Sequence, residues 1–140
     1  MSRLNKRVNV NVSLEEKRAW NTRMNEYGFN WGFSRAVRSI MRLEFEYVLV
    51  CGTIEDKITD RMIPRTTPVL INEPLDNIVS IAVNVCQAEL DLWRQLRNRL
   101  SIKSIQQLVI DTMRDALSIS VDASSMPRAK RVLTFDDIGG

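Results

Sequence analysis

Three polar residues occupy alternate positions near the N-terminus of the chain: Arg7, Asn9 and Asn11. Valine fills each position between them and the position after Asn11. Strict alternation of a β-branched residue with polar ones predicts a half-buried strand, with the valines on one face and the polar side chains on the other. Arginine can bond guanine bidentately and asparagine can do the same with adenine, so this polar row is chemically suited to reading base edges.

The pattern returns later in the chain, where residues 79–85 read VSIAVNV. A single constant offset aligns six pairs of identical residues: Val10 with Val83, Asn11 with Asn84, Val12 with Val85, Glu16 with Glu89, Trp20 with Trp93 and Asn25 with Asn98. A strand, a glutamate and a tryptophan that share one offset indicate an internal duplication. The residues that alternate with the apolar positions of the second strand are Ser80, Ala82 and Asn84, and we expect them to point outward.

Two helices are expected after each strand. The segment Ser13–Glu16 has the form of a capping box, in which the serine caps the helix and the last glutamate reaches back to the cap. This first helix is expected to run to about Tyr27 and to stop at Gly28. The second helix is expected to begin after Asn30, and its apolar stripe continues past Phe45.

In the second copy, Cys86 takes the place of the capping serine, and the last helix is expected to run roughly over residues 101–117. Its alignment with the second helix of the first copy needs a shift by one position, because the loops differ in length. A single short strand is not stable alone, so the two strands are expected to pair as an antiparallel ribbon above four helices. The predicted fold is therefore mostly α with a short two-stranded antiparallel β-ribbon. We expect this pairing within one chain; pairing between two chains, which gives at least a dimer, is the alternative.

The predicted organisation has four parts. Residues 1–50 form the first unit and residues 78–117 the second. Residues 51–77 contain three prolines and are expected to link the units. Residues 118–140 are expected to form a flexible tail.

Composition argues against several classes of protein. The chain has no histidine and two cysteines, Cys51 and Cys86, so it lacks the commonest general base and the commonest zinc ligand. We therefore expect no enzymatic activity, no metal and no cofactor, and we expect the cysteines to be small buried hydrophobes. No apolar run is long enough to span a bilayer, which favours a cytoplasmic protein with no membrane partner. The net charge is +3, and the basic excess lies in residues 1–47, which hold nine Lys/Arg against five Asp/Glu.

The run RVNVNVSLEE, followed by a helix, a loop and a second helix, resembles the ribbon-helix-helix repressors of the Arc and MetJ type. The resemblance covers residues about 6–47 and, more faintly, 78–117. It implies a ribbon that enters the major groove of double-stranded DNA, and the two copies in this chain would make it a tandem form, a pseudo-dimer. The base contacts that it implies are at the outward strand positions: Arg7, Asn9, Asn11, Ser80, Ala82 and Asn84. The phosphate contacts that it implies lie at the N-terminal arm and at helix N-termini: Arg3, Lys6, Gly32, Phe33, Ser34, Arg35, Lys103 and Ser104.

Two features depart from the family pattern. Most family chains carry one unit, whereas this chain carries two, as do the tandem accessory proteins of conjugation relaxosomes and some viral regulators. Ala82 stands where the family usually has a hydrogen-bonding side chain, so we expect the second strand to read less than the first. The preferred DNA site is then non-palindromic, with most information under the first strand.

The implied function is sequence-specific DNA binding, as a transcriptional repressor or as an accessory factor at an origin or relaxosome of a plasmid or virus. Binding as a dimer or as a cooperative oligomer on DNA is compatible with this function, as is association with a nucleoid.

Other interpretations remain open. Ribbon-helix-helix units also form the DNA-binding half of antitoxins, and here Val132, Leu133 and Phe135 of residues 118–140 would anchor a protein partner. The ribbon could instead serve dimerisation alone, and its asparagines could be ordinary solvated residues. Trp20 and Trp93 are expected to be core anchors rather than base-stacking platforms, because they lie on the apolar faces of their helices.

Overall fold

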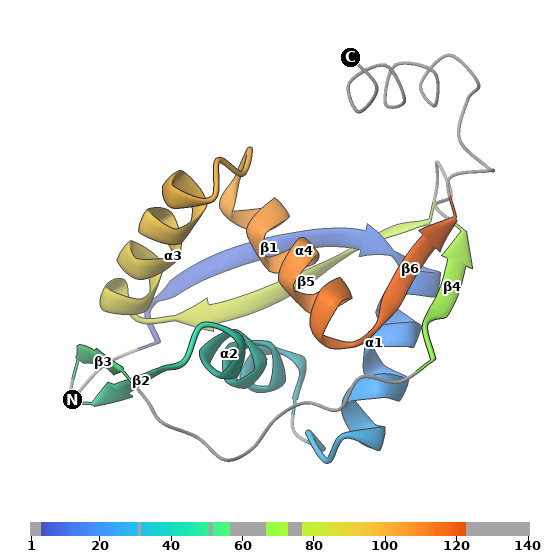
Figure 1. Cartoon of the computed structure of the whole chain (residues 1–140), viewed down its shortest axis with the longest axis horizontal. Helices are drawn as coiled ribbons and strands as arrows, with labels where there is room; N and C mark the ends of the chain where they lie inside the picture. Colours follow the sequence, from blue (N-terminus) through green and yellow to red (C-terminus); the bar gives the residue numbers. More distant parts are fainter. Residues whose placement is uncertain (1–3, 31, 51, 57–66, 73–76, 123–140) are drawn as a thin grey trace.

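The computed structural model describes residues 4–30, 32–50, 52–56, 67–72 and 77–122. Four helices and six strands lie within these ranges (Figure 1): β1 (Lys6–Ser13), α1 (Leu14–Glu26), α2 (Phe33–Glu44), β2 (Tyr47–Val50), β3 (Thr53–Asp56), β4 (Val69–Asn72), β5 (Ile78–Val85), α3 (Gln87–Arg99), α4 (Ile105–Ala116) and β6 (Ile119–Asp122). No helix in the described ranges is long and apolar enough to cross a membrane.

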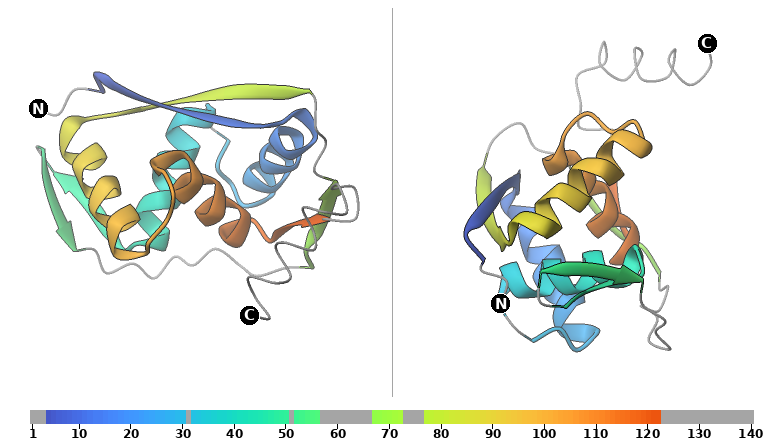
Figure 2. Two further views of the ribbon diagram at one scale, coloured as in Figure 1. Left: turned by 90° about the horizontal axis from the view of Figure 1, so that it is seen from above. Right: turned by 90° about the vertical axis from the view of Figure 1, so that its left-hand side faces the viewer.

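β1 and β5 pair antiparallel within one chain, as expected, so both strands of the ribbon come from the same polypeptide. Lys6 lies opposite Val85 and Ser13 lies opposite Ile78. The left view of Figure 2 shows the ribbon along one side of the molecule with helices on the other side. One face of the ribbon is therefore covered by helices, and the other face is directed away from them.

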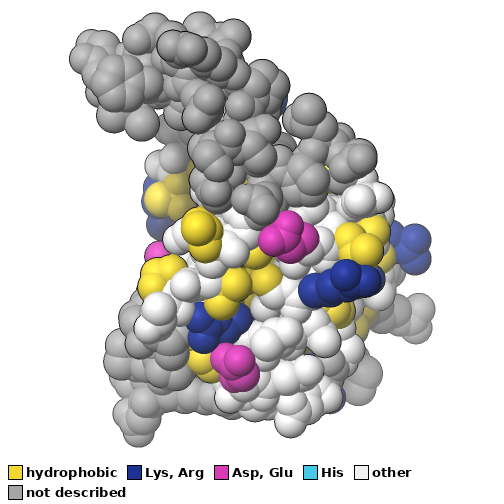
Figure 3. Space-filling model, turned by 90° about the vertical axis from the view of Figure 1, so that its right-hand side faces the viewer, with side chains coloured by type: hydrophobic (Ala, Val, Ile, Leu, Met, Phe, Trp, Pro, Cys, Tyr) yellow, Lys and Arg dark blue, Asp and Glu magenta, His cyan; other side chains and the backbone are white. Residues whose placement is uncertain are grey.

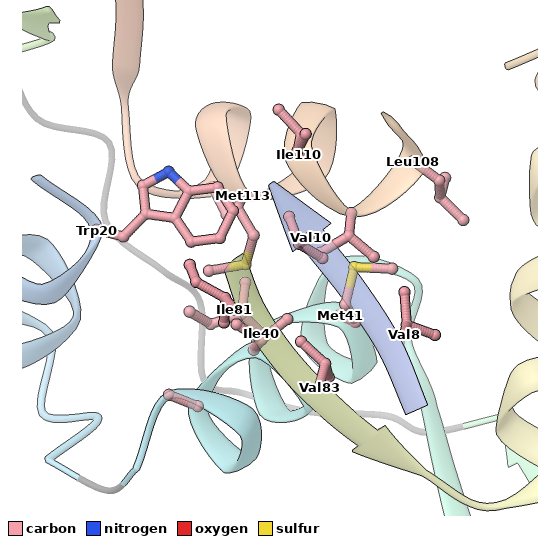
Figure 4. Packing of buried hydrophobic residues seen from close by; sticks show 14 of the residues in the cluster. Val8, Val10, Trp20, Ile40, Met41, Ile81, Val83, Leu108, Ile110 and Met113 are labelled. Carbon is pink, nitrogen blue, oxygen red and sulfur yellow. The ribbon is translucent and has the colours of Figure 1, made fainter. Parts of the chain in front are cut away.

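The covered face of the ribbon forms the centre of the core. Val10, Val83 and Val85 are fully buried, and Ile81 is nearly so. Figure 4 shows Val10, Ile81 and Val83 between Ile40 and Met41 of α2 and Leu108, Ile110 and Met113 of α4. Trp20 and Trp93 are both 0% exposed, which confirms that they are core anchors, and Cys86 is buried as predicted.

We expect Val10→Ala to lower the free energy of unfolding by about 1–3 kcal/mol, because removal of the two valine methyl groups leaves a void in a packed interior. Val50→Ala is the matched control, since Val50 of β2 is 46% exposed and loses little burial on truncation. Urea unfolding of both variants measures the difference. Equal effects of the two substitutions would contradict the assignment of Val10 to the core face.

The helix ends agree in part with the sequence pattern. α1 begins after Ser13 and ends before Gly28, which has a φ of 86° suited to glycine. α2 stops at Glu44 rather than continuing past Phe45. α4 begins at Ile105, later than expected, because Ser104 caps it by accepting a hydrogen bond from the Gln107 amide at 3.1 Å.

The fold is mixed α/β, and this corrects the prediction of a mostly α chain. Each unit ends in a further strand, β2 or β6, reached through a residue in the left-handed region: Glu46 with φ 52° and Ser118 with φ 54°. β2 pairs antiparallel with β3, and β6 pairs parallel with β4. The segment predicted as a linker therefore supplies β3 and β4, and the segment predicted as a tail begins with β6. These strands have only four residues each, too few for a periodicity signal in the sequence.

Two buried glutamates are paired across the units by arginines in a reciprocal manner. Arg42 of α2 donates to both carboxylate oxygens of Glu89 on α3, each at 2.9 Å. Arg114 of α4 donates to both oxygens of Glu16 on α1, each at 2.7 Å. Glu89 is 0% exposed and Glu16 is 2% exposed. The two glutamates are equivalent in the repeat, and so are the two arginines once the second helices are aligned, so the duplication seen in the sequence corresponds to a two-fold arrangement of contacts.

The predicted capping box is correct for Ser13 and wrong for the Glu16 carboxylate. Ser13 Oγ accepts a hydrogen bond from the Glu16 amide at 3.0 Å, as expected. The Glu16 carboxylate does not serve the cap; it binds Arg114 and accepts from Trp20 Nε1 at 3.1 Å. A carboxylate this deeply buried is stabilised far more by a guanidinium than by one backbone amide.

A tyrosine of the first unit joins the pair formed by Arg42 and Glu89. Tyr47 OH donates to Glu89 Oε2 at 2.6 Å and accepts from Trp93 Nε1 at 2.7 Å. Burial and the nearby charge of Glu89 raise the pKa of the Tyr47 hydroxyl above its ordinary value of 10.0.

Stability is therefore expected to fall in alkali. The unfolded chain loses the Tyr47 proton near pH 10.0 whereas the folded chain keeps it, so the unfolded state binds fewer protons and the free energy of unfolding decreases as pH rises past that value. Urea unfolding at several pH values between about 9 and 11 measures the slope. Tyr47→Phe should make the slope shallower, and an unchanged slope in that variant would show that other groups cause the loss.

Candidate nucleic-acid interface

The uncovered face of the ribbon brings together all six residues predicted to contact bases. Three cross-strand pairs lie on it: Arg7 opposite Asn84, Asn9 opposite Ala82, and Asn11 opposite Ser80. Five of these side chains are exposed and Asn84 is half-buried. The alternation that buries the valines is what aims these side chains outward. This surface, referred to below as the ribbon face, is polar except at Ala82.

The N-terminus of one helix abuts each edge of the ribbon. At the β5 edge, Ser34 Oγ of α2 accepts a hydrogen bond from the Asn84 amide at 2.8 Å. Arg38 of α2 donates to the Asn84 carbonyl oxygen at 2.7 Å and to Ser34 Oγ at 2.8 Å. At the β1 edge, Gln106 Oε1 of α4 accepts from the Asn11 amide. Both helix N-termini are thereby fixed beside the ribbon face.

The sequence patterns did not identify Arg38 or Gln106 as part of this interface. The available signal was the duplication itself, because Ser34 and Gln106 occupy equivalent positions when α2 is aligned with α4. Their amide partners, Asn84 and Asn11, are also related by the repeat. The two edge contacts are therefore equivalent in position although the side chains differ.

The residues predicted to contact phosphate lie at these helix N-termini where the structure describes them. Gly32 is the exposed N-cap of α2 and provides no side-chain cap, and a Cβ placed there would meet nothing within 4 Å. Phe33 and Ser34 are half-buried and Arg35 is exposed. An uncapped helix N-terminus with open space around it favours an anion.

The corresponding predicted residues of the second unit are Lys103, which is exposed, and Ser104, which caps α4. Lys6 is exposed at the start of β1. Arg3 lies outside the described residues. The structure therefore describes all of the positions predicted to contact phosphate except Arg3.

Positive charge gathers around the start of α2. Lys17 Nζ lies 5.5 Å from the centroid of the Phe33 ring, within cation–π range. Lys17, Arg18 and Phe33 line a shallow hollow between α1 and the start of α2. Burial and the neighbouring charge of Arg42 lower the pKa of Arg38, but arginine remains a cation across the accessible pH range.

Other parts of the surface are less uniform. Figure 3 shows the end of the molecule that carries α1, β4 and β6, where basic, acidic and apolar side chains are interspersed over the described surface. In the described ranges no group of three or more His, Cys, Asp or Glu residues is placed to hold a metal ion. Residues 123–140, which include the predicted protein-binding anchors Val132, Leu133 and Phe135 and the basic residues Arg128, Lys130 and Arg131, lie outside the described residues, as does Cys51.

Comparison of the chain with protein-family models, with curated proteins and with solved structures finds no match.

Proposed function

We propose that this chain is a sequence-specific double-stranded DNA-binding protein of tandem ribbon-helix-helix design, acting as a transcriptional repressor or as an accessory factor at an origin or relaxosome. It inserts the ribbon face into the major groove, which is wide enough for a two-stranded ribbon. Arg7, Asn9, Asn11 and Asn84 read base edges, with weaker contributions from Ser80 and Ala82. The starts of α2 and α4 hold the flanking phosphates.

One observation carries the proposal. The ribbon packs one face of apolar side chains into the core, while its other face presents Arg7, Asn9 and Asn11 to solvent between two helix N-termini. A ribbon whose only role is dimerisation needs a strand from a second chain, whereas both strands here belong to one chain. The polar ribbon face is therefore left available for another molecule.

The direct test is selection of duplexes from a random-sequence DNA pool by the full-length chain, followed by titration at several salt concentrations. We expect a defined sequence motif and an affinity that falls as salt rises, because lysine and arginine release counterions from phosphates. Absence of binding to any duplex at low salt would overturn the proposal.

Asn11→Ala is expected to weaken binding to the selected site by roughly 1–3 kcal/mol, since asparagine can pair bidentately with adenine. Folding should be unchanged, because Gln106 bonds the backbone amide of Asn11 and not its side chain. Asn25→Ala is the matched control, as Asn25 is exposed near the end of α1 and away from the ribbon. Equal affinities of the two variants for the selected site would show that the ribbon face does not read bases.

A further inference from the structure

The ribbon has an approximate two-fold axis at its centre, which follows from the register and the repeat. The offset between the two copies makes Asn9 equivalent to Ala82, and these two residues lie directly opposite each other. On either side of this centre, the axis relates each residue of β1 to the equivalent residue of β5 at the other end of the ribbon. Arg7 is equivalent to Ser80, yet the two lie at opposite ends of the ribbon because the strands are antiparallel.

Each end of the ribbon face therefore takes one outward residue from each strand. One end carries Arg7 with Asn84, and the other carries Asn11 with Ser80. The first end offers one side chain suited to guanine and one suited to adenine; the second offers an asparagine and a serine, which discriminates weakly. The sequence predicted that most of the information in the DNA site lies under the first strand. The register changes this prediction, because the unequal halves of the site lie under the two ends of the ribbon and not under its two strands.

The flanks of the ribbon are unequal in the same direction. The start of α2 meets the Arg7–Asn84 end, where Ser34 and Arg38 bond the backbone of Asn84. The start of α4 meets the other end, where Gln106 bonds Asn11. In the repeat, Gln107 stands at the position of Arg35 and Ile110 at that of Arg38. One end of the ribbon therefore has three arginines: Arg7, Arg35 and Arg38. The equivalent residues at the other end are neutral: Ser80, Gln107 and Ile110.

We infer that the chain recognises a non-palindromic DNA site in a single orientation, with the more constrained half of the site beneath the Arg7–Asn84 end. This inference rests on the proposed function. The identity of residue 80 decides the asymmetry between the base-reading side chains of the two ends, because an arginine there would give both ends an arginine and an asparagine at equivalent positions.

The test uses two duplexes: the site selected by the parent chain, and a palindrome built from two copies of its more constrained half. We expect Ser80→Arg to shift the ratio of affinities toward the palindrome by about 5- to 150-fold relative to the parent. Arg7→Ser should weaken binding to both duplexes. Gln95→Arg is the matched control, because it adds the same charge at an exposed position on α3 outside the ribbon face and should leave the ratio unchanged.

Two results would overturn the inference while leaving the proposed function in place. One is a palindromic motif selected by the parent chain. The other is a Ser80→Arg ratio equal to that of Gln95→Arg. Failure of the parent to bind any duplex at low salt is a different result, since it removes the proposed function itself and the inference with it.

Discussion

Arg42→Met is expected to lower the free energy of unfolding by about 3–5 kcal/mol, a large part of the roughly 5–15 kcal/mol that stabilises a typical domain. The cause is the carboxylate left behind. Glu89 is 0% exposed, and Arg42 supplies two of its hydrogen bonds and its opposing charge. Removing one partner of a buried pair leaves an uncompensated charge in a medium that solvates it poorly.

The reciprocal substitution, Arg114→Met, should have a similar effect through Glu16. Arg94→Met is the matched control, because Arg94 pairs with Asp91 at 3.5 Å on the exposed side of α3, where a salt bridge contributes at most about 1 kcal/mol. Chemical denaturation of the three variants measures the differences. A loss for Arg42→Met no larger than that for Arg94→Met would show that the buried pairs do not hold the two units together.

Simultaneous replacement of Arg7, Asn9 and Asn11 by alanine is expected to remove most of the preference for the selected DNA site. Each bidentate contact is worth about 1–3 kcal/mol, and the whole gap between specific and non-specific binding is roughly 4–10 kcal/mol. The helix N-termini still contact phosphates, so salt-dependent binding to unrelated DNA should persist. The stability of the fold should change little, because these side chains face away from the core.

A control with the same composition tests whether charge alone explains the result. Arg94, Asn25 and Asn98 are exposed residues of α1 and α3 that lie outside the ribbon face, and their triple replacement by alanine removes the same charge and the same two amides. Competition titrations with specific and unrelated duplexes compare the two triple variants. If both lose specificity equally, the ribbon face is not the base-reading surface.

The core and the ribbon were predictable because their signals are periodic. Alternating valines predicted β1, and the repeat of Val10, Trp20 and Glu16 at a fixed offset predicted its partner strand. The ribbon face followed from the same alternation, since side chains of a strand point to opposite faces in turn. The positions of all six outward residues are therefore those expected from the sequence.

The remaining features depend on partners that periodicity does not reveal. Glu16 has the position of a capping residue in the sequence, but its cation is Arg114, far along the chain. β3 and β4 lie in a segment with prolines and charges, and each becomes a strand by pairing with β2 or β6. Extension of the repeat past Leu117 would have aligned β6 with β2, because the offset that relates α2 to α4 continues through both strands.

The order of the ribbon strands along the chain has a consequence during synthesis. Synthesis proceeds at about 5–20 residues per second, and the ribosome releases β1, α1 and α2 first. β1 then has no strand to pair with until β5 has emerged as far as Val85. Until then the apolar side of β1 has no opposing half of the core, and Arg42 has no Glu89 to bind. The nascent first half therefore exposes an open strand edge that can pair with other chains. If translation stops before Val85, the product contains Arg7, Asn9 and Asn11 but lacks the complete partner strand of the ribbon.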